Sequence, residues 1–389
     1  MKSNQKKILL SLLILLAIFH PLSLDMYTPA FPLMQKSLGA SIDELQLSVS
    51  AFIGGLFIFQ FIYGIATEHF GRKRTLITGL LIYVFFSFFI SLIKTPEYLV
   101  YLRVLQAAGA GVGATLSISL VADFFDKNDI AAIRATIATG VSVALFFSPI
   151  IGGWIAEYVN WRAIFILQCL LGFLALMLSL SLLKKDKDRL YSFKQLCRFF
   201  PEIIANKTYL SFAIPISLQT AGMYSFITVA SSIYILHYHV KIIHFGWFYA
   251  VAILGYMTGN ILLKKLKVRY ADISIFKIGI TVSIISSFFI LLFSLFDFSY
   301  SYYGITIAMS FYMLSSGLVF PSGTSIAIQK YLNVTGIASS VLVSMKMLIA
   351  MLITGILGFI GSKNPEIFGV SIFMISLLSW VSHSFFRKL

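Results

Sequence analysis

The sequence predicts an all-α polytopic membrane protein in which twelve transmembrane helices form two pseudo-symmetric six-helix halves. Three observations predict this fold class. The 389-residue chain is 59% hydrophobic and 12% charged, whereas soluble domains carry about 25% charged residues. The mean hydropathy is +0.91. Twelve apolar runs follow one another along the chain, and one polar interval divides them into two sets of six.

Each apolar run is long enough to cross a bilayer, since about 20 residues span a hydrocarbon core of about 30 Å. The predicted helices lie at 8–33, 46–67, 75–93, 98–122, 132–156, 162–183, 208–236, 245–263, 274–296, 301–327, 335–361 and 366–385. The first run follows three lysines, as in a secretory signal, but the next segment, HPLSLDMY, lacks a small-residue cleavage pattern. We therefore expect an uncleaved first helix.

The distribution of basic residues predicts the orientation in the membrane. Of the 30 Lys and Arg, 23 fall at the termini, in the central interval, and in or at the edges of the loops after even-numbered helices, and five fall in or at the edges of the opposite loops. By the positive-inside rule, both termini are cytoplasmic. This distribution also accounts for the net charge of +15, so we expect the lipid bilayer and no nucleic acid as a partner.

The polar interval 184–207 carries seven cations and reads as a cytoplasmic linker between an N-terminal bundle, 1–183, and a C-terminal bundle, 208–389. A shift of 195 residues aligns the segment 64–74 with 259–269, and both segments hold a glycine followed by a basic cluster. Parallel six-helix repeats with a substrate site at mid-membrane are one plan of secondary transporters. The predicted organisation therefore favours a transporter.

The loop after the second helix, GIATEHFGRKR, combines two glycines with paired charges. Gly71 permits a sharp turn, and the acids in this region can pair with Arg72 or Lys73 and close one end of the half in one transport state. The alternative is a solvated charged loop. The candidate gate residues are Gly64, Glu68, Gly71, Arg72, Lys73 and Asp123. Their pattern resembles the major facilitator superfamily signature G-x-x-x-D-x-x-G-R-R/K, with Glu68 in place of Asp.

Three further segments resemble one group of that superfamily, the bicyclomycin-resistance (Bcr/CflA) drug:proton antiporters. The segment 25–32, DMYTPAFP, is similar to the end of helix 1 in that group. Arg103-x-x-Gln106 resembles the R-x-x-q-G motif, and the segment 148–153, SPIIGG, resembles the antiporter motif G-P-x-x-G-G. The resemblance implies the major facilitator fold and proton-coupled efflux of a small molecule or drug across a bacterial inner membrane. It implies no cofactor, with the proton gradient as energy source, and we expect a monomer.

Close helix packing also explains the residue pattern of the antiporter segment. Small residues recur every fourth position from Gly140 to Gly152 and give the fifth helix a smooth face for another helix. Pro149 removes one backbone donor and bends the helix. Packing explains most of this pattern, and the resemblance adds the direction of transport. The residues singled out here are Gly140, Ser148, Pro149, Gly152 and Gly153.

Charges inside predicted spans are costly, at about 2.5 to 3.5 kcal/mol at mid-bilayer. Asp25 and Arg103 fall at comparable depths in helices 1 and 4, where the two side chains can pair. Asp25 is the candidate proton carrier, because burial favours a protonated carboxylate and a nearby cation favours an ionised one. The alternatives are an interfacial acid that caps a helix end, for Asp25, and snorkelling to the outer surface, for Arg103.

Lys346 lies about 15 Å into helix 11, near the midplane. A fixed cation there favours an anionic or zwitterionic substrate, and the alternative is a structural pair with an undetected partner. The predicted substrate cavity consists of Tyr27, Gln106, Gln219, Tyr224 and Lys346.

Other functions find little support in the sequence. The motifs HExxH, GxxxxGK[ST] and GxSxG are missing, so we expect neither an enzyme nor an ATP-driven pump. His237, His239 and His244 are spaced as metal ligands but fall in an outer loop, so we expect no metal. Two alternatives remain open: export or import of an anionic metabolite such as a carboxylate siderophore, and a scaffold that does not transport.

Overall fold

The computed structural model describes residues 3–126, 129–183, 201–296, 300–331, 335–360 and 364–388. Within these ranges, twelve helices are long and apolar enough to cross a membrane. The predicted all-α class with twelve spans is therefore confirmed. The chain forms two compact units, Met1–Leu196 and Cys197–Leu389. Most of the predicted linker, 184–200, lies outside the described residues, and its cytoplasmic location stays a prediction.

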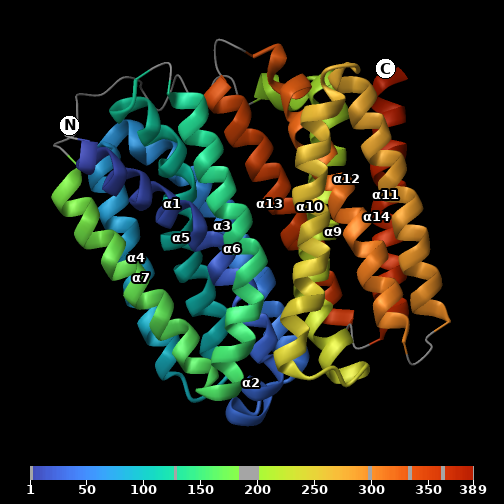
Figure 1. Cartoon of the computed structure of the whole chain (residues 1–389), viewed down its shortest axis with the longest axis horizontal. Helices are drawn as coiled ribbons and strands as arrows, with labels where there is room; N and C mark the ends of the chain where they lie inside the picture. Colours follow the sequence, from blue (N-terminus) through green and yellow to red (C-terminus); the bar gives the residue numbers. More distant parts are fainter. Residues whose placement is uncertain are drawn as a thin grey trace. The chain divides into compact units, whose positions relative to one another are not determined.

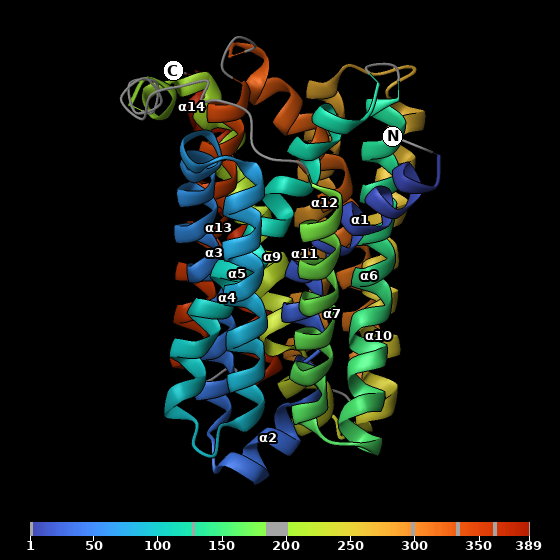
Figure 2. The same cartoon turned by 90° about the vertical axis from the view of Figure 1, so that its left-hand side faces the viewer.

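Unit 1 is a bundle of long helices in which the first span is interrupted. The chain bends after α1, passes through a short 3-10 helix that begins at Thr28, and continues into α2. In Figures 1 and 2, α2 lies at the end of this unit opposite to the N-terminus. The elements are α1 (Ser3–Asp25), η1 (Thr28–Ala30), α2 (Phe31–Leu38), α3 (Ile42–Phe70), α4 (Arg72–Leu92), α5 (Glu97–Phe124), α6 (Ile130–Tyr158) and α7 (Trp161–Leu182).

The ends of these helices follow from local sequence. Ser41 starts α3 with a capping box: its hydroxyl accepts the Glu44 N–H at 3.2 Å, and the Glu44 carboxylate accepts the Ser41 N–H at 2.7 Å. Asn160 starts α7 by accepting the Ala163 N–H at 2.9 Å. Gly71 separates α3 from α4 with φ of +90°, a conformation that side chains disfavour. The glycine-dependent turn predicted at this position is therefore present.

Small residues let α1 lie close to two other helices. A methyl group added to Gly113 of α5 would overlap the Leu16 carbonyl of α1, and one added to Gly152 of α6 would overlap the Met26 carbonyl at the end of α1. Close backbone approach of this kind is the usual way in which helices associate in lipid. It fixes the end of α1 within unit 1.

Unit 2 is a second bundle whose first span changes character near its end. There α9 passes into a π-helix, and the span runs from Lys207 to His237. Asn206 caps α9 by accepting the Tyr209 N–H at 2.9 Å. The elements are α9 (Lys207–Ser231), η2 (Ser232–His237), α10 (Ile242–Leu266), α11 (Asp272–Leu295), α12 (Ser301–Gln329), α13 (Thr335–Ile360) and α14 (Pro365–Lys388).

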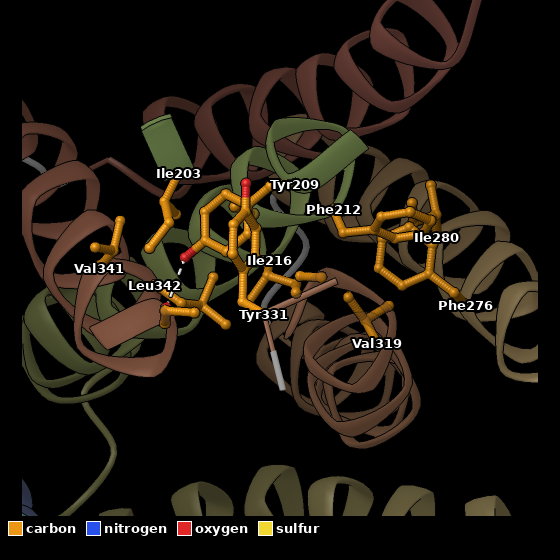
Figure 3. Close-up of a cluster of buried hydrophobic side chains, with 13 residues drawn as sticks. Ile203, Tyr209, Phe212, Ile216, Phe276, Ile280, Val319, Tyr331, Val341 and Leu342 are labelled. Atoms are coloured by element: carbon orange, nitrogen blue, oxygen red, sulfur yellow. Dashed lines mark hydrogen bonds between the residues drawn. The ribbon is translucent and has the colours of Figure 1, made fainter. Parts of the chain in front are cut away.

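A cluster of buried apolar side chains joins α9 to α11, α12 and α13 in unit 2, as Figure 3 shows. Tyr209 and Ile216 of α9 belong to this cluster together with Leu342 of α13. The Tyr209 hydroxyl also donates to the Ala338 carbonyl at 2.8 Å, the dashed line in Figure 3. Since lipid is as apolar as these side chains, close packing and this hydrogen bond hold α13 in place rather than the hydrophobic effect.

Candidate functional site

Asp25 is the last residue of α1, and it is 1% exposed. Its backbone carbonyl accepts a hydrogen bond from the Thr28 hydroxyl at 3.2 Å, which helps to turn the chain into η1. Gly152 allows α6 to approach the next residue, Met26, as described above. The carboxylate is therefore on a buried, tightly packed end of α1, which favours the predicted intramembrane acid over an exposed cap.

Arg103 of α5 is fully buried, at 0% exposed. Its guanidinium lies between two rings, 4.2 Å from the centroid of Tyr27 and 4.2 Å from that of Phe52. Rings on both faces provide cation–π stabilisation in place of water. This burial excludes the alternative that Arg103 snorkels to the surface in this structure.

Arg103 has a hydrogen-bond partner on its own helix. Nη1 donates to the Gln106 side-chain oxygen at 2.5 Å, and the predicted pairing of Arg103 with Asp25 stays a prediction. The physical reason is proximity, because residues three apart on a helix are neighbours. Nε and Nη2 have no hydrogen-bond partner among the described residues. Two nitrogen atoms of a buried cation are thus in reserve as donors.

Gln106 is held by two further side chains that the sequence analysis did not identify. Its Nε2 donates to the Ser87 hydroxyl of α4 at 2.8 Å and to the Gln168 side-chain oxygen of α7 at 2.8 Å. Gln168 in turn donates to the Leu22 carbonyl of α1 at 3.2 Å. All three side chains are buried. The relay from Leu22 through Gln168 and Gln106 to Arg103 therefore joins α1, α7 and α5.

The two ends of this relay fix its direction. A backbone carbonyl can only accept and a guanidinium can only donate, whereas an amide side chain does both. The Leu22 carbonyl must receive an N–H from Gln168, so the Gln168 oxygen faces Gln106 and the Gln106 oxygen faces Arg103. The orientation of the Gln106 amide toward the cation is thus set from α1, three residues before Asp25.

The Tyr27 side chain, predicted to line a substrate cavity, has a different environment. It is buried, and its hydroxyl shares a hydrogen bond of 3.0 Å with the Ser48 hydroxyl of α3. Its ring covers Arg103 on one face and lies 5.8 Å from the Phe165 ring of α7. These contacts favour a role as a wall around the cation.

Gln219 of α9, also predicted as a cavity residue, is the centre of a second polar group inside unit 2. Its Nε2 donates to the hydroxyls of Ser315 and Ser316 of α12, at 2.7 and 3.0 Å. Its oxygen accepts from the Ser283 hydroxyl of α11 at 2.9 Å, and that hydroxyl lies 3.1 Å from the Ser376 hydroxyl of α14. The amide is fully used by its own bundle, which favours a structural role. Tyr224, five residues further along α9, is also buried.

Lys346, the remaining predicted cavity residue, is a partly buried side chain near the middle of α13. Its ammonium nitrogen lies 4.8 Å from the centroid of the Phe320 ring of α12. It forms no ion pair with a residue that the structure describes. The undetected structural partner weighed above is therefore not found in the described part of the chain.

The basic residues of the predicted gate reach backbone carbonyls. Arg72 donates to the Ser119 carbonyl of α5 at 3.1 Å, and Lys73 donates to the carbonyls of Leu180 and Leu183 at the end of α7. A cation at a helix C-terminus is favourable because the carbonyl dipoles point toward it. The side chains of Glu68 and Asp123 and the surroundings of Gly64 lie outside what the structure describes, so the predicted pairing stays a prediction.

The antiporter segment of α6 packs against α1. Gly140 faces Ile14, whose Cγ2 would lie 2.6 Å from an added methyl group, and Gly152 faces Met26. The Ser148 hydroxyl donates to the Ala144 carbonyl one turn earlier, next to Pro149 inside the helix. Gly153 is buried. The smooth face predicted from the sequence is thus the face that receives α1.

Comparisons with known proteins agree with this architecture. The family profile of the Major Facilitator Superfamily matches residues 13–354. The chain is 24% identical over 350 residues to a bicyclomycin resistance protein homolog of Haemophilus influenzae, covering 88% of this chain and 87% of the relative. It is 24% identical to the multidrug resistance protein MdtL of Escherichia coli over 215 residues, 55% of each chain.

Solved structures show the same fold at low sequence identity. The D-xylose-proton symporter superposes with a TM-score of 0.77 at 14% identity, covering 96% of this chain and 97% of the symporter. A bacterial homolog of the human lysosomal transporter Spinster superposes with a TM-score of 0.70 at 16% identity, covering 99% of this chain and 97% of the homolog. Likenesses at this identity establish the fold alone. The profile match covers most of the sequence, so this chain belongs to the Major Facilitator Superfamily and is a multi-pass membrane transporter, not an enzyme.

Proposed function

We propose that this chain is an antiporter that couples proton entry to the efflux of a small molecule or drug across a bacterial inner membrane, by alternating access. Asp25 carries the proton, and Arg103 stabilises its ionised form in one transport state. The observation that carries the proposal is the buried charge of unit 1: Arg103 is wholly enclosed, and two of its nitrogen atoms have no hydrogen-bond partner among the described residues.

An enclosed cation with spare donors is unfavourable unless another state uses them, because each unmade hydrogen bond to a buried polar group costs about 1 to 3 kcal/mol. Asp25 belongs to the same bundle, and the ring that covers Arg103 comes from Tyr27, two residues later. In the proposed cycle the ionised carboxylate takes the spare donors after proton release. Protonation from the outside then separates the pair. A proton that falls through 100 mV supplies about 2.3 kcal/mol per cycle.

The names of two relatives support efflux as the direction, since both refer to drug resistance. Bicyclomycin is therefore the first compound to test. The structural neighbour that is a proton symporter shares only the fold and does not bear on direction. We further propose that both termini are cytoplasmic, which a reporter fused to the C-terminus tests directly.

The decisive experiment uses inverted membrane vesicles that hold an acidified lumen. Addition of bicyclomycin, or of a compound found by comparing knockout and overexpressing cells, should release protons in vesicles with the native protein. The variant Asp25→Asn should abolish this release at equal amounts of folded protein. Glu157→Gln, which changes an exposed carboxylate of the same bundle, is the matched control and should behave as the native protein. Full proton release by Asp25→Asn would refute the assignment.

A second candidate function is transport of an anionic metabolite such as a carboxylate siderophore. The observation that favours it is Lys346, a cation inside a spanning helix with no ion-pair partner in the described part of its half. Direction is open for this candidate. On addition of an uncoupler, the cytoplasmic level of the metabolite rises if the protein exports it and falls if the protein imports it.

A further inference from the structure

Lys346 lies on the buried side of α13. Leu342 and Ala350, one helical turn before and after it, are both buried. The large apolar side chains of α13 that are exposed come later in the helix and are Leu352, Ile356 and Ile360. Lys346 therefore does not belong to the exposed face, and its charge has to be accommodated inside the protein.

Among the described residues of the half that contains Lys346, no carboxylate lies at this depth. Its carboxylates in the sequence are Glu202, Asp272, Asp297 and Glu366. Of these, Asp297 lies outside the described residues, and the other three are at or before the starts of helices. Lys346 is near the middle of α13, where an uncompensated charge costs about 2.5 to 3.5 kcal/mol. An anion that arrives from outside the bundle would remove this cost.

Aromatic side chains from two neighbouring helices lie beside the ammonium. The Phe320 ring of α12 is 4.8 Å from Nζ, and the Tyr256 ring of α10 is 6.2 Å from the Phe320 ring. Gly317 brings α10 and α12 together at this level, because a methyl group added to it would lie 2.6 Å from the Tyr256 carbonyl oxygen. The position of Tyr256 next to Phe320 is thus built into the packing of the two helices.

We propose that Lys346, Phe320 and Tyr256 form a binding site for an anion carried on a flat apolar body, of which an aromatic carboxylate is the simplest example. An ammonium has three N–H donors, and only the side facing the Phe320 ring is engaged by it. The carboxylate accepts the remaining donors, and the apolar body lies along the two aromatic rings. The inference rests on the proposed transport function, because it names the substrate class of that function. A lipophilic cation is repelled from the same site.

The test is binding to the purified full-length protein in detergent, followed by thermal unfolding. Three probes separate charge from shape: benzoate, benzamide, which has the ring without the charge, and cyclohexanecarboxylate, which has the charge without a flat ring. A ligand that binds the native state raises the melting temperature in a saturable way. We expect benzoate to do so at the lowest concentration, cyclohexanecarboxylate at a higher one, and benzamide not at all.

Two variants assign the two parts of the site. Lys346→Gln should weaken benzoate binding about tenfold or more, because a charge-assisted hydrogen bond is lost, whereas Lys346→Arg should retain it. Phe320→Leu should reduce the preference for benzoate over cyclohexanecarboxylate, a readout that stands even if Lys346→Gln fails to fold. Lys277→Gln, an exposed lysine of α11 in the same half, is the matched control and should bind as the native protein.

Equal binding of benzoate and benzamide, or undiminished benzoate binding by Lys346→Gln, would overturn the inference. Asp25→Asn should still bind benzoate, because the assay needs no proton gradient. If the native protein binds benzoate but releases no protons in the vesicle assay, that result would therefore count against the proposed antiport and not against the binding site.

Discussion

Each half of this transporter contains a buried glutamine at the centre of a hydrogen-bonded group, Gln106 in unit 1 and Gln219 in unit 2. In both amides the nitrogen donates to hydroxyl, amide or carbonyl oxygens, and the oxygen accepts from one donor. The donor is the difference. The oxygen of Gln106 faces the guanidinium of Arg103, whereas that of Gln219 faces the hydroxyl of Ser283.

This difference distinguishes a polar group that holds helices together from one that we propose takes part in transport. The group around Gln219 consists of neutral side chains whose hydrogen bonds stay within one bundle, so we expect it to hold helices together. The group around Gln106 holds helices in the same way and also contacts a cation, two of whose nitrogen atoms have no hydrogen-bond partner among the described residues. A polar group inside a membrane bundle thus indicates function when it contains a charge that its own hydrogen bonds do not exhaust.

The largest expected effect is one that both halves share. Gly152→Val and Gly255→Val each place a side chain where a backbone carbonyl of a neighbouring helix lies, that of Met26 and that of Ser310. Overpacking against backbone should cost more than about 3 kcal/mol in each case, and little folded protein should remain after solubilisation. Gly355→Ala, at a position with no atom within 4 Å, is the control for size-exclusion profiles and melting temperatures. If one glycine variant remained folded after solubilisation and the other did not, the two halves would not depend on close helix packing to the same extent.

The next effect separates the halves. Gln106→Leu and Gln219→Leu should each lower stability by about 1 to 3 kcal/mol, since each strands several buried partners. Transport corrected for the amount of folded protein should then differ: Gln106→Leu should lose proton coupling, and Gln219→Leu should keep it. Melting temperatures and proton release in inverted vesicles measure the two quantities. If both variants lost coupling alike, the distinction between cohesion and function would fail.

A smaller effect sharpens the role of the relay. In Gln168→Glu the side chain can still accept from Gln106, but it can donate to the Leu22 carbonyl only when protonated. Coupling should therefore be nearly normal at low pH and should fall about two- to tenfold as rising pH removes that proton, the range expected for one lost hydrogen bond. Gln168→Met should be impaired at every pH. A flat pH profile for Gln168→Glu would mean that Gln168 acts only in packing.

The smallest effect concerns surface ion pairs, one found in the described part of each half. Lys6 and Asp126 of unit 1 are 3.1 Å apart, as are Lys267 and Asp272 of unit 2. Lys6→Gln and Lys267→Gln should each change stability by less than about 1 kcal/mol, because solvent screens exposed pairs. Melting temperatures of the native protein and each variant at low and high salt measure this contribution, because salt screens the ion pair. A larger loss of stability in one half would show that its ion pair contributes more than a solvent-screened surface contact does.

Hydropathy was enough to predict the twelve spans, because lipid demands long apolar helices whatever their partners are. The turn at Gly71 was equally predictable, since one residue type tolerates its backbone conformation. The burial of Asp25 and Arg103 also followed from their positions in apolar runs. These features depend on single residues or on composition within one helix.

Partners between helices were not predictable in the same way. Gln168 is a lone amide in an apolar run, and no sequence pattern states that it faces Gln106 of another helix. Arg103 donates to Gln106 of its own helix, a hydrogen bond that the sequence analysis did not predict. Gln219 has the composition of a cavity residue, yet serines from three other helices surround it. Such pairings depend on helix rotation, which composition does not specify.

The fixed polarity of the relay has a consequence for proton movement. A chain of hydrogen bonds conducts protons only if all its members can reverse together, and here neither end can, because the Leu22 carbonyl has no hydrogen and the Arg103 guanidinium has no lone pair to offer. The two glutamines therefore cannot conduct protons between Leu22 and Arg103. If Asp25 carries the proton, as proposed, the proton must arrive and leave by another route than this relay.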